Sequence, residues 1–246
     1  MATITTGSFA KALWPGVNSW YGKSYNEHVV EWDALFDSFN SNKNYEEDMG
    51  ITSFGLASAK PEGSAISYDE ERQGFLTRYT HVVYANGFIV TREMVEDDLY
   101  SVVAQKRAKG LAYSMRQTKE NVAANVYNRA FNGSFTGGDG LELCSTAHVN
   151  VAGGTWANEL TTAADLSEAA LEQACIDIGK YTDDRGLKIS VHPITLNIPV
   201  DLTYEAHRIM ETPHRVGTAD NDINALYSMG KFPGGVNVNH YFNDTD

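Results

Sequence analysis

The most regular hydrophobic pattern in the sequence lies between residues 96 and 133, where proline is absent. Acidic residues at 96–98 favour a helix start, because the N-terminal end of a helix attracts negative charge. Asn132-Gly133 is typical of a helix end. Between them, a stripe recurs at helical spacing: Leu111, Met115, Val122, Val126 and Ala130. The pattern predicts one helix of about 35 residues between 96 and 133, with Gly110 as a point where it could kink or break.

This predicted helix is long for a chain of 246 residues. About 35 residues at 1.5 Å each give roughly 52 Å. A compact globule of this length has a diameter of about 46 Å. A helix as long as its globule suggests a surface that the chain does not cover alone. Five basic residues lie off its apolar stripe and are expected in solvent: Lys106, Arg107, Lys109, Arg116 and Lys119.

Strand-forming residues are concentrated over 77–95, which include Val82, Val83 and Ile89. Asn86-Gly87 in their middle is compatible with a tight hairpin turn or with a bulge that bends one long strand. The sequence alone slightly favours the hairpin.

Residues 49–76 contain few core-forming side chains and have turn chemistry at "KPEGS". A loop of this length without its own core is uncommon in a compact domain. We expect a two-stranded arm with Lys60, Pro61, Glu62 and Gly63 at its tip. Because an isolated hairpin is marginal in water, the arm needs another surface.

The first 48 residues mix aromatic and polar side chains. From 28 to 39 the spacing predicts a short amphipathic helix. Its apolar face comprises Val29, Trp32, Phe36 and Phe39. The preceding stretch, with Trp14, Trp20 and Tyr21, has no period. It could lie over this chain's own core or dock on a neighbour, and the sequence leaves both open.

The second half of the chain predicts mixed structure. A Gly-rich loop covers 133–164, and a helix follows over 165–186, capped by Asp165 or Ser167. A short edge strand at 194–200, a capped helix at 201–211 and a strand-like stretch at 236–242 complete the pattern.

Charge excludes one class of function. The chain carries 19 basic and 32 acidic residues, a net charge of −13. Proteins that read duplex DNA neutralise phosphates with Lys and Arg, so sequence-specific DNA binding is not expected. No segment is apolar enough to span a membrane, and the N-terminus lacks a signal-type apolar run. We therefore expect synthesis in the cytoplasm and no membrane partner.

Candidate chemistry is sparse. Common nucleotide, zinc-protease and hydrolase motifs are missing. An EF-hand-like start at 220–224 lacks the glycine and glutamate that such a loop needs. His207, Glu211 and His214 are separated by a proline and make a poor zinc set. Cys144 and His148 could be nucleophile and base, but no third group is evident. We expect no enzyme, no cofactor and no metal.

Several long stretches nevertheless resemble one family. They are "FGLASAKPEGSAISYDEERQGFLTRYTHVVYANGFIVTREMVEDDLY", "AKGLAYSMRQTKENVAANVYNRAFN", "GGDGLELCSTAH" and "NELTTAADLSEAALEQACIDIGKYTDDRGLKI", with "TADNDINALYSMG" and "VNVNHYFNDTD" near the end. These stretches are similar to the major capsid protein of tailed bacteriophages, which has the α+β HK97-like fold. The likeness covers nearly the whole chain.

The resemblance implies how the chain is divided into domains. Residues 1–48 would be the N-arm, 49–77 the E-loop, 78–186 the P-domain with its spine helix at 97–131, and 187–246 the A-domain. It favours one bent strand through Gly87 over the hairpin. Family members continue with another strand-rich segment, so the A-domain end at Asp246 would be incomplete or short.

The resemblance also implies a function. Many copies, as hexamers and pentamers, would form an icosahedral head shell in the host cytoplasm and enclose double-stranded DNA without sequence preference. The E-loop tip and the N-arm would contact neighbouring subunits. A portal would be a partner, and scaffolding and decoration proteins stay open. Lys60 is the candidate for a covalent link, although we expect non-covalent locking. The alternatives are a cellular nanocompartment shell and a soluble enzyme using Cys144 and His148.

Overall fold

The computed structural model describes residues 10–91, 93, 100–215 and 222–243. The chain forms two compact units. The first comprises Met1–Phe39 and Val82–Asn125, and the second comprises Asn40–His81 and Val126–Asp246. The start of the predicted long helix, at 97–99, lies outside the described residues.

The long helix is confirmed. A π-helical turn, Tyr100–Ala104, leads into α3, Gln105–Asn128, which continues through Gly110 without a break. Its most buried face was not the predicted one, since Val122 and Val126 are exposed. Instead, every fourth residue is buried: Ala104, Ala108, Ala112, Arg116, Glu120 and Ala124. This row of small side chains with two charged members carries too little hydrophobicity to stand out in a periodicity search.

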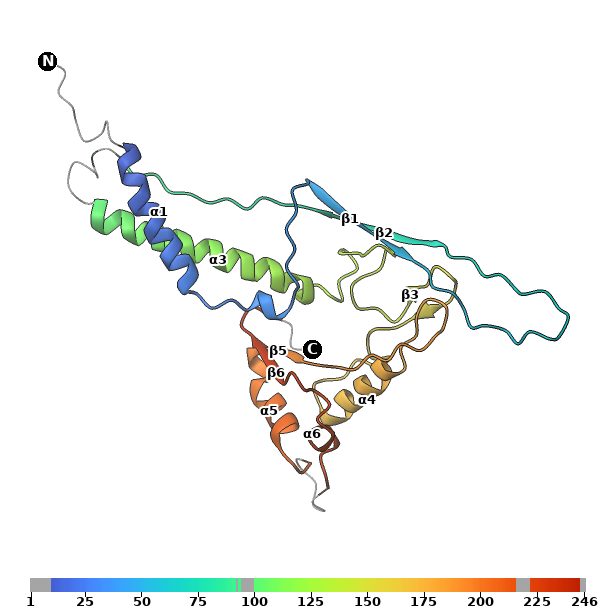
Figure 1. Ribbon diagram of the computed structural model, residues 1–246. Coiled ribbons are helices and arrows are strands. Elements are labelled where there is room, and N and C mark those ends of the chain that lie inside the picture. Colours follow the sequence, from blue (N-terminus) through green and yellow to red (C-terminus); the bar gives the residue numbers. More distant parts are fainter. Residues whose placement is uncertain (1–9, 92, 94–99, 216–221, 244–246) are drawn as a thin grey trace. The chain divides into compact units, whose positions relative to one another are not determined.

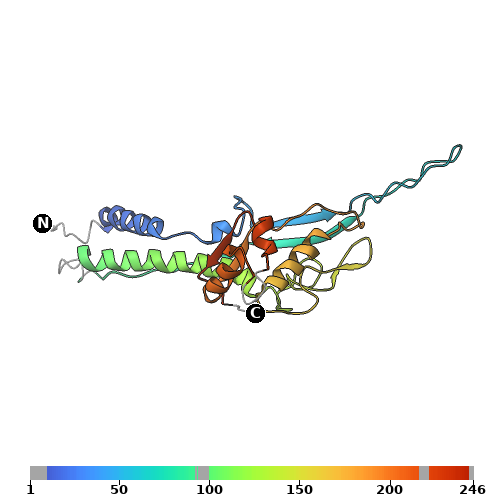
Figure 2. The same ribbon diagram turned by 90° about the horizontal axis from the view of Figure 1, so that it is seen from below.

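The predicted helix over 28–39 is wrong. The helix lies earlier, as α1, Ala10–Glu27, and only a 3-10 turn, Trp32–Ala34, follows it. Within the first unit, α1 lies beside α3 (Figure 1, Figure 2). Pro15 and Gly16 disfavour a helix locally, and packing against a neighbouring helix offsets that intrinsic cost. Val29 and Phe39, two members of the predicted apolar face, are exposed.

The predicted hairpin at Asn86-Gly87 is also wrong. Residues 81–91 form no strand, so the continuous bent strand is not formed there either. The segment contacts α3 instead, because the Arg107 guanidinium of that helix donates to the Ile89 carbonyl at 2.9 Å. Its β-forming side chains stay exposed, including Val83 and Ile89.

A two-stranded ribbon in the second unit confirms the two-stranded arm, although the strands lie at its base. β1, Tyr45–Ile51, pairs antiparallel with β2, Gln73–Thr80. The register shifts between Met49 and Ile51, which makes a bulge at Gly50. Gly74 lies against Gly50 here, and a Cβ on Gly74 would be 2.8 Å from the Gly50 carbonyl oxygen. The close backbone approach explains why glycine stands at position 74.

The core of the second unit includes one buried residue, Leu171, from α4, Glu168–Gly179. Ser167 caps this helix by accepting from the Ala170 N–H at 3.2 Å. A parallel pair, β5 Leu196–Pro199 and β6 Val236–Asn239, confirms the two predicted strands. A 3-10 turn at Val200–Leu202 leads into helix α5, Thr203–Glu211, and helix α6, Ala225–Met229, comes later in the chain. The buried centre comprises Leu171, Ile209 and Leu226.

Two helix predictions in this unit need correction. α4 ends at Gly179 rather than at 186, because 182–188 turn back on themselves through a Thr182–Lys188 bridge. α5 has no side-chain cap, since Leu202 occupies that position. The side-chain cap belongs to α6, which the sequence did not reveal. Asn224, fully buried, accepts from the Tyr227 N–H at 3.2 Å.

The Gly-rich loop at 133–164 contains one small antiparallel pair, β3 His148–Val149 and β4 Thr155–Trp156. Gly153 and Gly154 between them have positive φ, which the tight turn requires.

We predict that Gly74→Ala loosens the ribbon. The new methyl group would meet backbone atoms of Gly50, which can yield only by moving the strand, at a cost of about 1–3 kcal/mol. Hydrogen exchange of the β1 and β2 amides should therefore increase. Gly87→Ala is the matched control, because nothing lies within 4 Å of a Cβ there. Equal exchange in both variants would contradict the close approach.

Candidate intersubunit contact site

The loop between β1 and β2, residues 52–72, projects away from the ribbon (Figure 1, Figure 2). The predicted tip residues lie at its turn. The Pro61 carbonyl accepts from the Ser64 N–H at 3.3 Å and from the Ser64 hydroxyl at 2.8 Å. Gly63, with φ of 78°, takes the position that needs a positive φ. Lys60, Pro61, Glu62 and Gly63 are all exposed.

Apolar side chains of the arm lack cover within their own unit. Leu56 is 86% exposed, Ile66 64% and Tyr68 94%. One cross-arm contact joins the hydroxyls of Ser58 and Ser67 at 3.1 Å. Exposed large apolar residues grouped on one projecting segment indicate an interaction surface.

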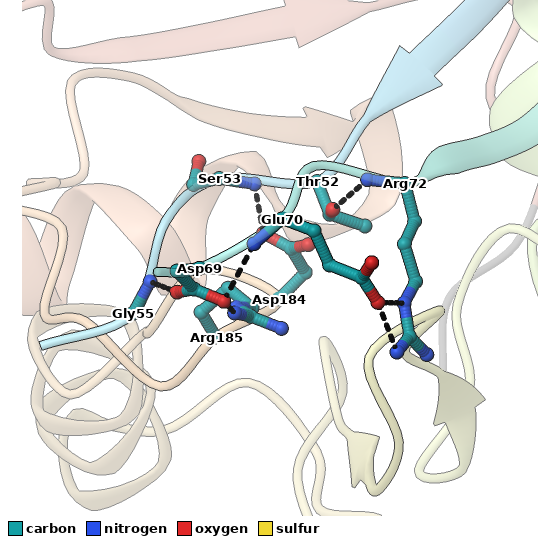
Figure 3. Close-up of polar contacts among 8 residues, drawn as sticks. All are labelled: Thr52, Ser53, Gly55, Asp69, Glu70, Arg72, Asp184 and Arg185. Atoms are coloured by element: carbon teal, nitrogen blue, oxygen red, sulfur yellow. Dashed lines mark hydrogen bonds and ion pairs between the residues drawn. The ribbon is translucent and has the colours of Figure 1, made fainter. Parts of the chain in front are cut away.

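Asp69 organises the base of the arm (Figure 3). One of its oxygens accepts from the Gly55 N–H at 2.8 Å, across the arm, and the other accepts from the Glu70 N–H at 2.9 Å. The same carboxylate pairs with the Arg185 guanidinium, which comes from the loop after α4. This pairing and the two backbone hydrogen bonds hold the pKa of Asp69 far below its usual range.

A second contact lies beside the first. The Ser53 N–H donates to the Asp184 carboxylate at 3.4 Å (Figure 3). Thr52, which is buried, accepts from the Arg72 N–H at 2.8 Å and closes the arm at its base. The base of the arm is thus fixed to residues 184 and 185 by side chains, whereas its tip is free of such contacts among the described residues of this unit.

In the first unit, one buried carboxylate on α3 binds the backbone of the N-terminal segment, here residues 28–36. Glu120 is 1% exposed and accepts from the Trp32 N–H at 2.9 Å and the Glu31 N–H at 3.3 Å. The carboxylate thereby satisfies donors at the start of the 3-10 turn. Lys119 is exposed, as expected, and its Nζ also lies 3.8 Å from the centroid of the Trp32 ring.

Aromatic residues of α1 face the same helix. The ring of Tyr21 stacks on Tyr25 with centroids 5.9 Å apart, and the Arg116 guanidinium lies 4.5 Å from the Tyr25 ring centre. Arg116 was expected in solvent but is 8% exposed. Trp20 is half-buried, and the side chain of Trp14 lies outside the described residues. The sequence left open whether this stretch lies over its own chain or on a neighbour. In the structure, Tyr21 and Tyr25 line a hollow of about 440 Å³ together with α3 of the same chain.

The structure does not assemble a nucleophile from Cys144 and His148. His148 is buried, with Nδ1 2.6 Å from the Asp139 carboxylate and Nε2 3.2 Å from the Asn158 amide oxygen. Asp139 is the third group that the sequence did not reveal. Both ring nitrogens of His148, however, already interact with Asp139 and Asn158. Burial raises the pKa of the Cys144 thiol, which disfavours the reactive thiolate.

No cluster of three potential metal ligands occurs among the described residues. His207, Glu211 and His214 accordingly do not come together as a three-ligand set there. In the same part of the chain, no helix combines the length and hydrophobicity that crossing a membrane requires.

A family model described as "Phage capsid protein" matches residues 76–245, more than half of the chain. The chain belongs to this family. It is a structural capsid component, not an enzyme. No curated protein matches the sequence.

Solved structures show that the fold is that of phage capsid subunits. A chain from the procapsid of bacteriophage JBD30 aligns with a TM-score of 0.63 and 14% identity, over 96% of this chain and 99% of that one. A JBD30 capsid chain gives 0.59 and 13%, over 82% and 88%. A chain from the JBD30 capsid decorated with minor capsid protein trimers gives 0.57 and 11%, over 83% and 88%.

Sequence reasoning found the tip of the arm but missed its base. Asp69, Asp184 and Arg185 stand in ordinary polar stretches, and no local pattern marks residues separated by more than 100 positions as partners. Glu120 was missed as well, because it lies off the predicted apolar stripe and its burial is evident only in the structure.

We predict that Glu120→Ala frees the N-terminal segment. The N–H groups of Glu31 and Trp32 would lose a charged acceptor, which costs about 1.5–3 kcal/mol. Unfolding by urea should shift to lower concentration, and exchange at 28–36 should rise, with Glu120→Gln intermediate. Asn121→Ala, the exposed neighbour on α3, is the control. Unchanged exchange in Glu120→Ala would refute the role of Glu120.

We predict an acid-sensitive contribution from Asp139 in this capsid protein. Burial raises its pKa, but hydrogen bonds from His148 and the Leu141 N–H outweigh burial and leave the pKa below its ordinary 3.8. The stabilisation is therefore complete above about pH 3.8 and is lost as pH falls through the folded pKa. The Tm gap between wild type and Asp139→Asn should shrink below pH 3.8, whereas exposed Asp165→Asn should show no such gap. A gap independent of pH would contradict it.

Proposed function

We propose that this capsid protein self-assembles, as hexamers and pentamers, into an icosahedral head shell that encloses double-stranded phage DNA. The arm at 49–77 covers a neighbouring copy, with Lys60, Pro61, Glu62 and Gly63 in the contact. The observation that carries the proposal is the exposure of Leu56, Ile66 and Tyr68 on a segment with no cover of its own. Many simultaneous copies of one modest contact give a stable closed shell.

The HK97-like layout is part of this proposal. The N-arm is 1–48, the E-loop 49–77, the P-domain 78–186 and the A-domain 187–246. The long helix α3 and the projecting loop support the spine-helix and E-loop assignments. Trp14, Trp20 and Tyr21 are proposed as N-arm contacts between subunits. For Tyr21, this contact is additional to its packing beside α3 of the same chain.

The charge of the chain suits a container for DNA. A net charge of −13 repels phosphates, so packaged DNA does not adhere to a lining with this character. The shell assembles in the host cytoplasm, with a portal as partner. The matched JBD30 capsid is decorated with minor capsid protein trimers, which supports a decoration protein as a partner here. The family match supports a phage shell over a cellular nanocompartment.

Deleting residues 58–64 tests the arm. We expect a folded, soluble subunit that forms no stable shells, because the deletion removes the tip while the ribbon and core remain. Electron microscopy and sedimentation measure particles, and circular dichroism measures folding. A companion variant changes Leu56, Ile66 and Tyr68 to serine. A control changes Ser58 and Ser67 to alanine and should assemble. Normal particles from the deletion would refute the role of the arm.

A further inference from the structure

We propose that Asp69 and Arg185 form a latch that holds the base of the arm on the loop at 182–188, and that the bulge at Gly50 and Gly74 is the hinge on which the arm turns when the latch opens. The turning arm rests on the proposed function, because a reorienting arm matters only if it reaches another copy. The latch itself is a property of the unassembled subunit.

The attachment of the arm is confined to its base. Among the described residues, the hydrogen bonds and ion pairs joining 52–72 to the rest of the second unit are the Asp69–Arg185 pair and the Ser53–Asp184 bond (Figure 3). Further out, the contacts are internal to the arm, as between Ser58 and Ser67. Two adjacent residues of one loop therefore set the direction in which the arm leaves the body of this unit.

The loop that carries Arg185 is well ordered by its own bonds. The Asp183 carboxylate accepts from the Arg185 N–H at 3.0 Å and from the Leu187 N–H at 2.7 Å. The Asp183 N–H donates to the Leu187 carbonyl at 2.8 Å, and Gly186 has φ of 81°. Arg185 is thus presented from a fixed position, so the arm is the part that moves when the pair separates.

The pair is suited to opening. Asp69 is 41% exposed at its side chain and Arg185 19%, so water and salt reach the interaction. Exposed ion pairs contribute little and are screened by salt. Opening leaves both charges accessible to water, and no buried charge is stranded. A latch of this kind holds one orientation without preventing another.

The hinge lies where the ribbon is irregular. The register of β1 and β2 shifts at Gly50, and Gly74 opposite it has no side chain to resist a change in backbone angle. Glycine accepts backbone conformations that other residues avoid. A rotation at this point moves the whole arm and leaves the paired residues from Tyr45 to Met49 in place.

Hydrogen exchange of the full chain, at a concentration where light scattering detects no particles, tests the latch. Arg185→Gln and Asp69→Asn should raise exchange at 52–56 and 68–72 roughly two- to fivefold, as expected for loss of an exposed pair. The charge-swapped double variant, Asp69→Arg with Arg185→Asp, should return hydrogen exchange toward the wild-type rate. Wild type in 1 M salt should resemble Arg185→Gln, since the Debye length there is only about 3 Å.

Glu70→Gln is the matched control. It breaks the Glu70–Arg72 pair, which is internal to the arm, and should leave exchange at 52–56 unchanged. The latch is refuted if hydrogen exchange at 52–56 in Arg185→Gln equals that of wild type. It is also refuted if Glu70→Gln raises that exchange as much as Arg185→Gln does. Particles are not needed for this measurement, so failure of shell assembly and failure of the latch are separate results.

Paired spin labels test the hinge. They are placed at Glu62→Cys and Lys188→Cys, with Cys144 and Cys175 replaced by alanine. The distance distribution should widen with Arg185→Gln and narrow again when Gly50→Ala is added. A distribution that Arg185→Gln leaves unchanged would overturn the hinge.

Discussion

The constraint on which this structure depends is a shortage of buried apolar surface. In the described part of the chain, the buried hydrophobic side chains larger than alanine are Leu171, Ile198, Ile209 and Leu226. Burial of apolar surface is the main stabilising contribution in most domains. A chain with so few large buried side chains must hold its outlying segments by other means, or leave apolar residues for a neighbour to cover.

Carboxylates that accept backbone hydrogen bonds provide one of those means. Glu120 holds the N-terminal segment, Asp69 the base of the arm, Asp183 the loop beneath it and Asp139 the Gly-rich loop. Each accepts at least one backbone N–H, and hydrogen bonds to an ionised acceptor are stronger than neutral ones. The segments are therefore positioned by directional polar contacts, which fix geometry with little buried area.

The sequence predicted what local chemistry determines. The long helix, the two-stranded arm, its turn at Pro61–Gly63 and the two strands near 194–200 and 236–242 follow from proline, glycine and hydrophobic spacing, although the parallel pairing of those strands was not predicted. It did not predict α1, because Pro15 and Gly16 disfavour a helix that tertiary contacts support. It placed a hairpin at Gly87 because strand propensity does not reveal that a ladder partner is missing. The latch was out of reach, since Asp69 and Arg185 are 116 positions apart.

These carboxylates also change the meaning of the acidic composition. A net charge of −13 suggests at first a surface that repels DNA. Yet Glu120 is buried, and Asp69 and Asp139 are bound to a cation or a histidine. Such acids contribute to geometry, and part of their field is cancelled locally. In the proposed DNA container, repulsion of DNA would therefore depend on the exposed, unpaired acids. Replacing those alone would alter the proposed lining, while the arm, its base and the N-terminal segment would keep their positions.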